Sequence, residues 1–94
     1  MKKIIWTDVA VEDLQNIHDY IAQDSLYYAE VLCAEIVLRV DQLLSFPKIG
    51  RSVPEYKDDL TREIIVNDYR VIYELVGNKI NILVIIHGAK LLET

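Results

Sequence analysis

Hydrophobic and polar positions follow two different periods along this 94-residue chain. Up to about residue 45, apolar side chains recur every three or four positions, which is the spacing of one face of an α-helix. From residue 60 onward, runs rich in Ile, Val and Tyr are separated by polar pairs, a pattern typical of β-strands and tight turns. Residues 2–6 form one further strand-like run, so the pattern predicts the order β-α-α-β-β-β.

Two helices are expected in the first half. The first follows a capping oxygen on Thr7 or Asp8, and the second begins near Ser25 and ends before Pro47, which forces the preceding residue out of the helical region. The apolar stripe of the first helix is Ala10, Leu14, Ile17 and Ile21. Only a short joint at residues 23–25 separates the two helices, so they should form an antiparallel hairpin.

The second half is expected to form strands over residues 60–66, 69–76 and 79–87. The pairs Asn67-Asp68 and Gly77-Asn78 suit two-residue hairpin turns, in which positive φ angles are needed. Residues 46–59 hold prolines, a glycine and charges without periodicity, and we expect a loop there. The predicted fold is therefore α+β, one domain that spans all 94 residues, with the helical hairpin packed on a small antiparallel sheet of three or four strands.

The two turns determine which strand residues lie opposite one another. With two-residue turns, Ile64 faces Val71, and Val71 in turn faces Val84. Because side chains alternate between the two faces of a sheet, one face is almost wholly apolar and should receive the helices. Its members are Ile64, Val66, Tyr69, Val71, Tyr73, Leu75, Ile80, Ile82, Val84 and Ile86.

The opposite face mixes apolar and charged side chains. Its members are Glu63, Ile65, Arg70, Ile72, Glu74, Asn81, Leu83, Ile85 and His87. In this register Arg70 lies opposite Ile85 and diagonal to His87. Glu63 lies one strand away. Such a face is either a groove for another chain, a chemical site, or an open surface on which Arg70 and Glu63 form an ion pair.

The charge of the chain bears on its partners. Ten basic and fifteen acidic residues give a net charge of −5. An acidic chain is repelled by phosphate backbones, so we expect no direct tight binding to DNA or RNA by the chain alone. Residues 1–47 carry three basic and eight acidic side chains, whereas residues 48–94 carry seven of each. Any site that handles anions is therefore expected in the second half.

Other classes of protein are disfavoured by residue types that are scarce. The single Cys33 leaves no internal disulfide, and the two histidines lack metal-ligand spacing, so we expect no metal and no cofactor. No stretch approaches the roughly 20 apolar residues of a membrane span, and the first residues do not resemble a signal peptide. We therefore expect a cytoplasmic protein without membrane contact.

Short motifs between Trp6 and Lys90 carry a resemblance to a known family. They are Trp6, Ala10, Asp13-Leu14, Ile17, Tyr20-Ile21, Phe46-Pro47, Gly50-Arg51, Pro54-Glu55, Leu60, Arg62-Glu63, Tyr69-Arg70, Tyr73, Ile86-His87-Gly88 and Lys90. In order and spacing they resemble the RelE/ParE superfamily of toxins from type II toxin–antitoxin modules. The expected element order agrees with the small α/β fold of that superfamily. The loop motifs and the ending look more like its ParE branch.

The resemblance implies a growth-inhibiting toxin whose main partner is an antitoxin with a flexible C-terminal part that wraps it. ParE-like toxins are described as poisons of DNA gyrase without a known catalytic site, and they serve in plasmid stabilisation. We expect this function first. One alternative is a RelE-like, ribosome-dependent mRNA endonuclease. Another is a member without toxicity that acts only as an interaction partner.

The nuclease alternative names candidate catalytic residues. Cleavage of RNA through the 2′-hydroxyl needs a base, an acid and a positive charge on the phosphate. By resemblance, these roles fall to Glu55, Arg70 and His87. Candidates for contact with an anion or a target are Arg51, Arg62 and Lys90. Structural roles are also open: Arg51 can hold its loop by donating to backbone carbonyls, and His87 can bond a carbonyl near its strand end.

Overall fold

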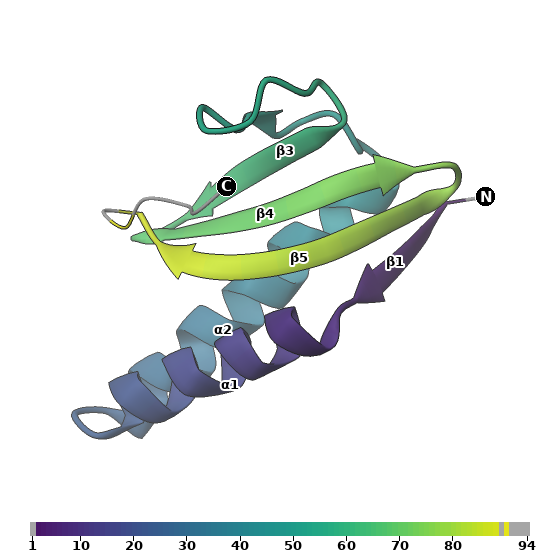
Figure 1. The fold of residues 1–94 in the computed structure, drawn as a ribbon. Coiled ribbons are helices and arrows are strands. Elements are labelled where there is room, and N and C mark those ends of the chain that lie inside the picture. The colour runs from purple at the N-terminus through teal and green to yellow at the C-terminus, as the bar shows by residue number, and fades with distance from the viewer. Residues whose placement is uncertain (1, 89, 91–94) are drawn as a thin grey trace.

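The fold has two layers, in which two helices cover one face of a five-stranded sheet (Figure 1). The computed structural model describes residues 2–88 and 90. In chain order the elements are β1 (Lys3–Trp6), α1 (Asp8–Ala22), α2 (Leu26–Asp41), the short 3-10 helix η1 (Gln42–Leu44), β2 (Arg51–Ser52), β3 (Thr61–Val66), β4 (Tyr69–Val76) and β5 (Lys79–His87). The predicted α+β architecture and element order are confirmed, with β2 as an addition inside the expected loop.

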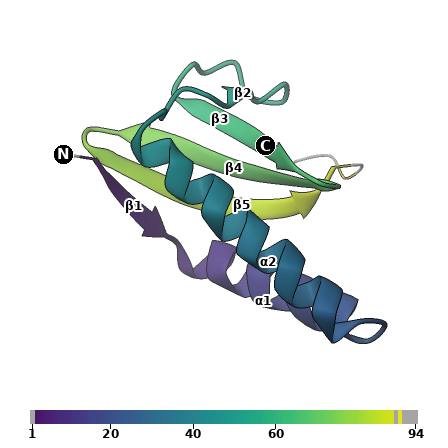
Figure 2. The same cartoon turned by 180° about the vertical axis from the view of Figure 1, so that it is seen from behind.

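The strands lie side by side in the order β1-β5-β4-β3-β2. Strands β2 to β5 are antiparallel neighbours, whereas β1 runs parallel to β5. The sequence predicts an antiparallel sheet of three or four strands, so the parallel edge and the fifth strand are differences. Parallel neighbours need a long crossover connection. Here the chain between β1 and β5 includes both helices, which lie in front of the sheet in the view of Figure 2.

Both helices begin at capping side chains that the sequence predicts. The Thr7 hydroxyl accepts a hydrogen bond from the Ala10 amide at 3.2 Å. The Ser25 hydroxyl accepts one from the Tyr28 amide at 3.2 Å. The Thr7 hydroxyl also donates to the carbonyl oxygen of Ile82 at 2.6 Å, so the residue that starts α1 also ties it to β5.

The two hairpins turn where the sequence predicts, and Asn67 and Gly77 have φ angles of 56° and 60°. Strand β3 pairs with β4 in the predicted register, with Ile64 opposite Val71. From the second turn as far as Tyr73, β4 and β5 also pair as predicted.

A β-bulge changes the pairing of the remaining part of β5. Ile72 lies opposite Val84, so Leu83 is an extra residue, and Val71 lies opposite Ile85 instead of Val84. The predicted faces of residues 84–87 are therefore wrong by one position, and Ile85 turns to the helix side, where it is 4% exposed. Residues 82–86 are apolar at every position, so alternation of side chains does not fix the register there.

The main core lies between the helices and one face of the sheet. It includes the buried residues Ala10, Ile17, Leu32, Ile36, Val40, Leu43, Ile64, Val66, Val71, Tyr73, Ile80, Ile82 and Ile85. Outside this cluster, Val53 is 1% exposed and Ile72 is fully buried. Val53 belongs to the segment after β2, so this segment covers part of the mixed face, which the sequence predicts to be open.

Candidate functional site

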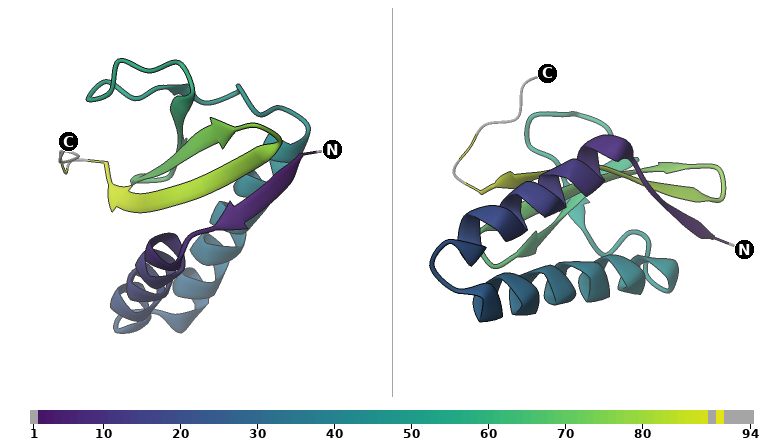
Figure 3. Two further views of the ribbon diagram at one scale, coloured as in Figure 1. Left: turned by 45° about the vertical axis from the view of Figure 1, so that its right-hand side comes forward. Right: turned by 90° about the horizontal axis from the view of Figure 1, so that it is seen from below.

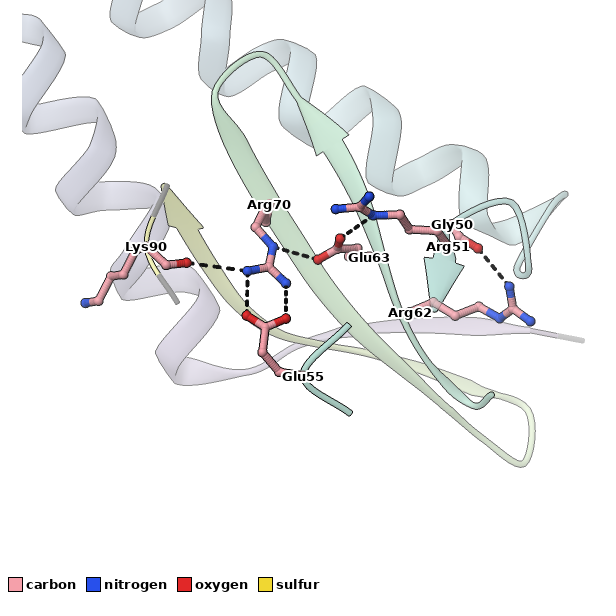
Figure 4. A network of polar contacts seen from close by, with 7 residues as sticks. All are labelled: Gly50, Arg51, Glu55, Arg62, Glu63, Arg70 and Lys90. Carbon is pink, nitrogen blue, oxygen red and sulfur yellow. Dashed lines mark hydrogen bonds and ion pairs between the residues drawn. The ribbon is translucent and has the colours of Figure 1, made fainter. Parts of the chain in front are cut away.

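The covered face of the sheet holds a network of charged side chains from β2, β3, β4 and the loop between β2 and β3 (Figure 4). Glu63 on β3 is at its centre, and its side chain is fully buried. Arg51 lies opposite Glu63 in the β2–β3 pairing and donates to its carboxylate. Arg70 on β4 donates from Nε to Oε1 of Glu63 at 2.7 Å. Pairing of short strands therefore brings together three charges that are far apart in the sequence.

Arg70 is bonded on both sides of its guanidinium group. Nη1 and Nη2 donate to the two carboxylate oxygens of Glu55 at 2.9 and 2.8 Å, and Nη1 also lies 3.4 Å from the carbonyl oxygen of Lys90. The bidentate bond with Glu55 raises the pKa of Arg70 further above its ordinary value. Burial lowers this pKa, and the hydrogen bond and charge of Glu63 raise it again. Four of the five N–H groups of this guanidinium thus have partners within the protein.

The network has no formal net charge, because two arginines offset two glutamates. Charge-assisted hydrogen bonds of this kind are short and directional, and they attach the loop carrying Glu55 to the middle of the sheet. The side chain of Arg70 is 7% exposed and that of Glu55 is 17% exposed. The arrangement therefore positions chain segments well but offers little free positive charge to a phosphate.

A second set of hydrogen bonds holds the segment between η1 and β2. Nη1 of Arg62 donates to the carbonyl oxygens of Lys48 at 3.2 Å and Gly50 at 2.8 Å. The Tyr73 hydroxyl donates to the carbonyl oxygen of Pro47 at 2.8 Å and accepts from the Gly50 amide at 3.1 Å. We call these four bonds the loop clamp. They fix three of the four backbone positions from Pro47 to Gly50.

The loop clamp explains the glycine at position 50. A Cβ atom there would lie 2.6 Å from the Tyr73 hydroxyl and 2.6 Å from the carbonyl oxygen of Glu63. Burial raises the pKa of the Tyr73 phenol, although the Gly50 amide and the charge of Arg62 lower it, so the phenol stays protonated and able to donate. The structural role that the sequence suggests for Arg51, donation to loop carbonyls, belongs to Arg62 instead.

His87 lies on the other face of the sheet from the charged network. After the bulge it is opposite Tyr69, and the two rings meet edge to face with centroids 5.6 Å apart. Arg70 lies opposite Ile86, so the predicted diagonal contact between Arg70 and His87 is wrong. Because successive side chains point to opposite faces, the imidazole lies on the helix side and Arg70 on the loop side. The structure brings Glu55 and Arg70 together and leaves His87 apart from them.

The three residues predicted to contact an anion or a target differ in how far their side chains are exposed to solvent. The Arg51 side chain is 62% exposed even though it bonds Glu63. Arg62 is 14% exposed and is occupied by the loop clamp. Lys90 is exposed and contributes its backbone carbonyl to the network, while its side chain points away from Glu55 (Figure 4). A hollow of about 270 Å³ beside the network is lined by Arg51, Pro54, Glu55, Arg70 and Gly88.

Two further properties concern cofactors and membranes. Among residues 2–88 and 90, no group of three or more His, Cys, Asp or Glu side chains is placed to hold a metal ion. In the same part of the chain, no helix has both the length and the apolar character that crossing a bilayer requires.

Comparison with known proteins places this structure in a family. Residues 4–92 match the family model of the ParE toxin of the type II toxin–antitoxin system parDE. Toxin RelE2 of Caulobacter vibrioides is 30% identical over 91 residues, which is 97% of this chain and 100% of that toxin. A solved chain of the chromosomal ParDE toxin–antitoxin system from P. aeruginosa has a TM-score of 0.77 and 24% identity, covering 93% of this chain and 96% of its own length. Because the family match spans both helices and nearly the whole sheet, this chain belongs to the ParE toxin family of type II toxin–antitoxin systems.

Proposed function

We propose that this toxin inhibits growth by binding a protein target, and that the target is DNA gyrase or a related topoisomerase. Membership of the ParE family implies an antitoxin as partner. In this proposal both proteins act in the cytoplasm, and the antitoxin keeps the toxin inactive while the two are bound. The toxin then needs a recognition surface and no catalytic centre.

The observation that carries the proposal is the occupation of Arg70. A nuclease that used this residue would present it to a phosphate, yet its donors are bound to Glu55 and Glu63. Removing one member of a buried ion pair is strongly unfavourable, because the other charge loses its partner. His87, which would transfer a proton, lies on the opposite face. These groups do not converge on one position that a scissile phosphate could occupy.

The surface also favours a protein partner over a nucleic acid. The net charge of −5 opposes the approach of a phosphate backbone. The helical hairpin exposes several large apolar side chains, namely Leu26, Tyr27, Tyr28, Val31 and Leu38. Apolar groups gathered within a polar surface mark sites of protein interaction. We propose that the antitoxin covers this part of the hairpin with a helix or an extended segment.

Induction of the toxin in cells separates the two targets. The DNA-damage response and the integrity of reporter mRNAs are followed in the same culture, and supercoiling by purified gyrase is measured with purified toxin. The proposal predicts a DNA-damage response, intact mRNAs and inhibited supercoiling, all reversed by co-expression of the antitoxin. Rapid cleavage of ribosome-bound mRNA with supercoiling unaffected would overturn it. A folded toxin without any effect on growth would favour a member that acts only as an interaction partner.

The two histidines provide a matched test of the same proposal. His87→Ala should change the inducer concentration needed for growth arrest by less than about twofold, because no proton transfer is involved. General acid–base catalysis contributes about 10²–10⁴-fold to a rate, so a nuclease that used His87 would lose about that much. His18→Ala is the control, since His18 is a half-buried α1 residue outside the charged network, 3.5 Å from Asp19 and 3.4 Å from Glu30. Loss of growth arrest in His87→Ala alone would contradict the proposal.

A further inference from the structure

The segment between η1 and β2 exposes two large apolar side chains at one end of the molecule. Phe46 and Ile49 are each 62% exposed. They belong to a hollow of about 520 Å³, which we call the Phe46 hollow, lined by Lys2, Phe46, Pro47, Lys48, Ile49 and Leu75. Figures 2 and 3 show the chain after α2, the start of β1 and the β4–β5 turn at this same end.

The backbone beneath these exposed side chains is held firmly. The loop clamp fixes positions 47, 48 and 50 through Tyr73 and Arg62, and the Ile49 amide donates to the carbonyl oxygen of Phe46 at 3.1 Å. None of these bonds involves the side chain of Phe46 or Ile49. The fold thus holds two apolar groups in position without burying them. Groups positioned in advance lose little entropy on binding, which is typical of the residues that dominate an interface.

The rim of the Phe46 hollow is positive although the protein is acidic overall. Lys2 and Lys48 line it, and Lys3 lies opposite Lys79 in the β1–β5 pairing at the same end. These are four of the ten basic residues in a chain of net charge −5. Within residues 2–88 and 90, Lys48 has Asp59 as an ion-pair partner at 3.9 Å, with both side chains more than half exposed. An ion pair this exposed holds its members only weakly, so Lys48 remains able to attract a carboxylate of a partner.

We propose that the Phe46 hollow is an anchor site for the antitoxin, and that it takes a bulky apolar side chain flanked by Asp or Glu. This rests on the proposed function, because the antitoxin is the partner that the family assignment implies. The apolar side chain displaces water from Phe46 and Ile49, and the neighbouring carboxylates pair with Lys2 and Lys48. A second copy of this chain fits less well, since a symmetric contact would bring two lysine rims together.

The hollow is one part of a larger interface. A stable protein complex buries about 1,600 Å² in total, more than a single hollow of this size provides. The hairpin surface described above would supply further area. Within such an interface, a few well-held apolar anchors carry most of the affinity. Substitutions in the hollow should therefore weaken binding far more than equal substitutions elsewhere.

The affinity of the toxin for the protein encoded by the neighbouring reading frame tests the anchor site. The complex is purified, the toxin is separated in guanidinium chloride and refolded, and each variant is titrated with labelled antitoxin by fluorescence anisotropy. Phe46→Ser should weaken binding about tenfold or more. Leu60→Ser, which removes a 49%-exposed apolar side chain outside the hollow, should change it less than about twofold. Circular dichroism checks folding, and Ile49→Ser serves as a second variant.

The charged rim has its own matched pair. Lys48→Glu should weaken binding about fivefold, mainly by slowing association, and the effect should shrink as salt is added. Lys57→Glu makes the same change of charge on an exposed loop residue that does not line the hollow, and should change affinity less than about twofold.

Three outcomes overturn the proposal. Unchanged affinity in Phe46→Ser, Ile49→Ser and Lys48→Glu would remove the anchor site and leave the toxin–antitoxin pairing intact. Loss of growth arrest in Phe46→Ser with full antitoxin affinity would assign the hollow to the target instead. Absence of binding by the unaltered toxin would overturn the pairing and the anchor site together, which distinguishes failure of the proposed function from failure of this inference.

Discussion

At the scale of single residues, Glu63 is the centre of the ion-pair network that holds the loop against one face of the sheet. Its buried carboxylate accepts hydrogen bonds from Arg51 and Arg70, and Arg70 in turn holds Glu55 of the loop. A buried guanidinium is stable only when carboxylates surround it. One glutamate thus connects three strands to a segment that has little regular structure of its own.

Replacement of Glu63 measures this connection. Glu63→Ala should lower the free energy of unfolding by about 3 kcal/mol, because Arg70 stays buried with one of its two carboxylates missing. Lys48→Ala, at an exposed ion pair, should change it by less than about 0.5 kcal/mol. Urea unfolding followed by circular dichroism gives both values. A loss below about 1 kcal/mol in Glu63→Ala would mean that the network contributes little to stability.

At the scale of elements, the segment between η1 and β2 behaves as a fixed part of the sheet. It contains no helix or strand, yet the loop clamp ties it to β3 and β4 through Arg62 and Tyr73. Because the backbone at position 50 lies so close to Tyr73 and Glu63, a side chain there would clash, and glycine is needed. The geometry at Gly50 therefore differs in kind from that at Gly77, where the chain needs a positive φ angle but has open space.

The two glycines predict different costs for the same substitution. Gly50→Ala would place a methyl group 2.6 Å from a backbone carbonyl oxygen and should lower the free energy of unfolding by about 2–3 kcal/mol. Gly77→Ala meets nothing within 4 Å and should cost about 1 kcal/mol, through its left-handed backbone alone. Thermal unfolding of both variants checks the order. Equal losses would show that the contacts around Gly50 can relax.

The junction of α1 with β5 depends on a side chain from the helix. Strand β1 pairs with β5 only as far as Trp6 and Ile82, so beyond that point no strand from residues 2–88 or 90 lies beside the outer edge of β5. There the Asp13 carboxylate accepts a hydrogen bond from the Ile85 amide at 2.9 Å. A helix side chain thus satisfies a backbone group that a neighbouring strand would otherwise bind.

Exchange of the Ile85 amide with solvent reports on this junction. Asp13→Ala should speed that exchange about tenfold and lower the free energy of unfolding by about 1–2 kcal/mol, because the amide loses its acceptor. Asp19→Ala removes a 64%-exposed carboxylate from the same helix and should leave the Ile85 amide unchanged. Hydrogen exchange measured by NMR distinguishes the two. Unaltered exchange in Asp13→Ala would show that water satisfies the amide equally well.

At the scale of the whole molecule, the parts that the sequence predicts are those set by repeated local signals. Helical spacing and two turn pairs determine the layers, and the hydroxyl of Thr7 marks the first helix start. The bulge at Leu83 could not be foreseen, because residues 82–86 of β5 are all apolar. Either register therefore places an apolar side chain against the helices. It moves His87 to the helix side and so separates it from Arg70.

The charged site could be predicted only in part for a similar reason. The pairing of Arg70 with Glu63 follows from strand register, which a tight turn fixes. The choice between Arg51 and Arg62 as the residue that holds the loop depends on contacts 12 and 14 residues apart in the sequence. Tyr73 offered a usable signal, since a phenol on a core face needs a hydrogen-bond partner when it is buried.

The Asp13 contact with β5 has a consequence for the life of the free toxin. An unpaired strand edge is a template on which strands of other chains can add, and it leads to aggregation. Asp13 occupies an amide on that edge, and α1 lies alongside it. In the proposed function, toxin released from its antitoxin has to stay dispersed until it meets its target. The carboxylate of Asp13 therefore helps protect the free toxin from edge-to-edge self-association.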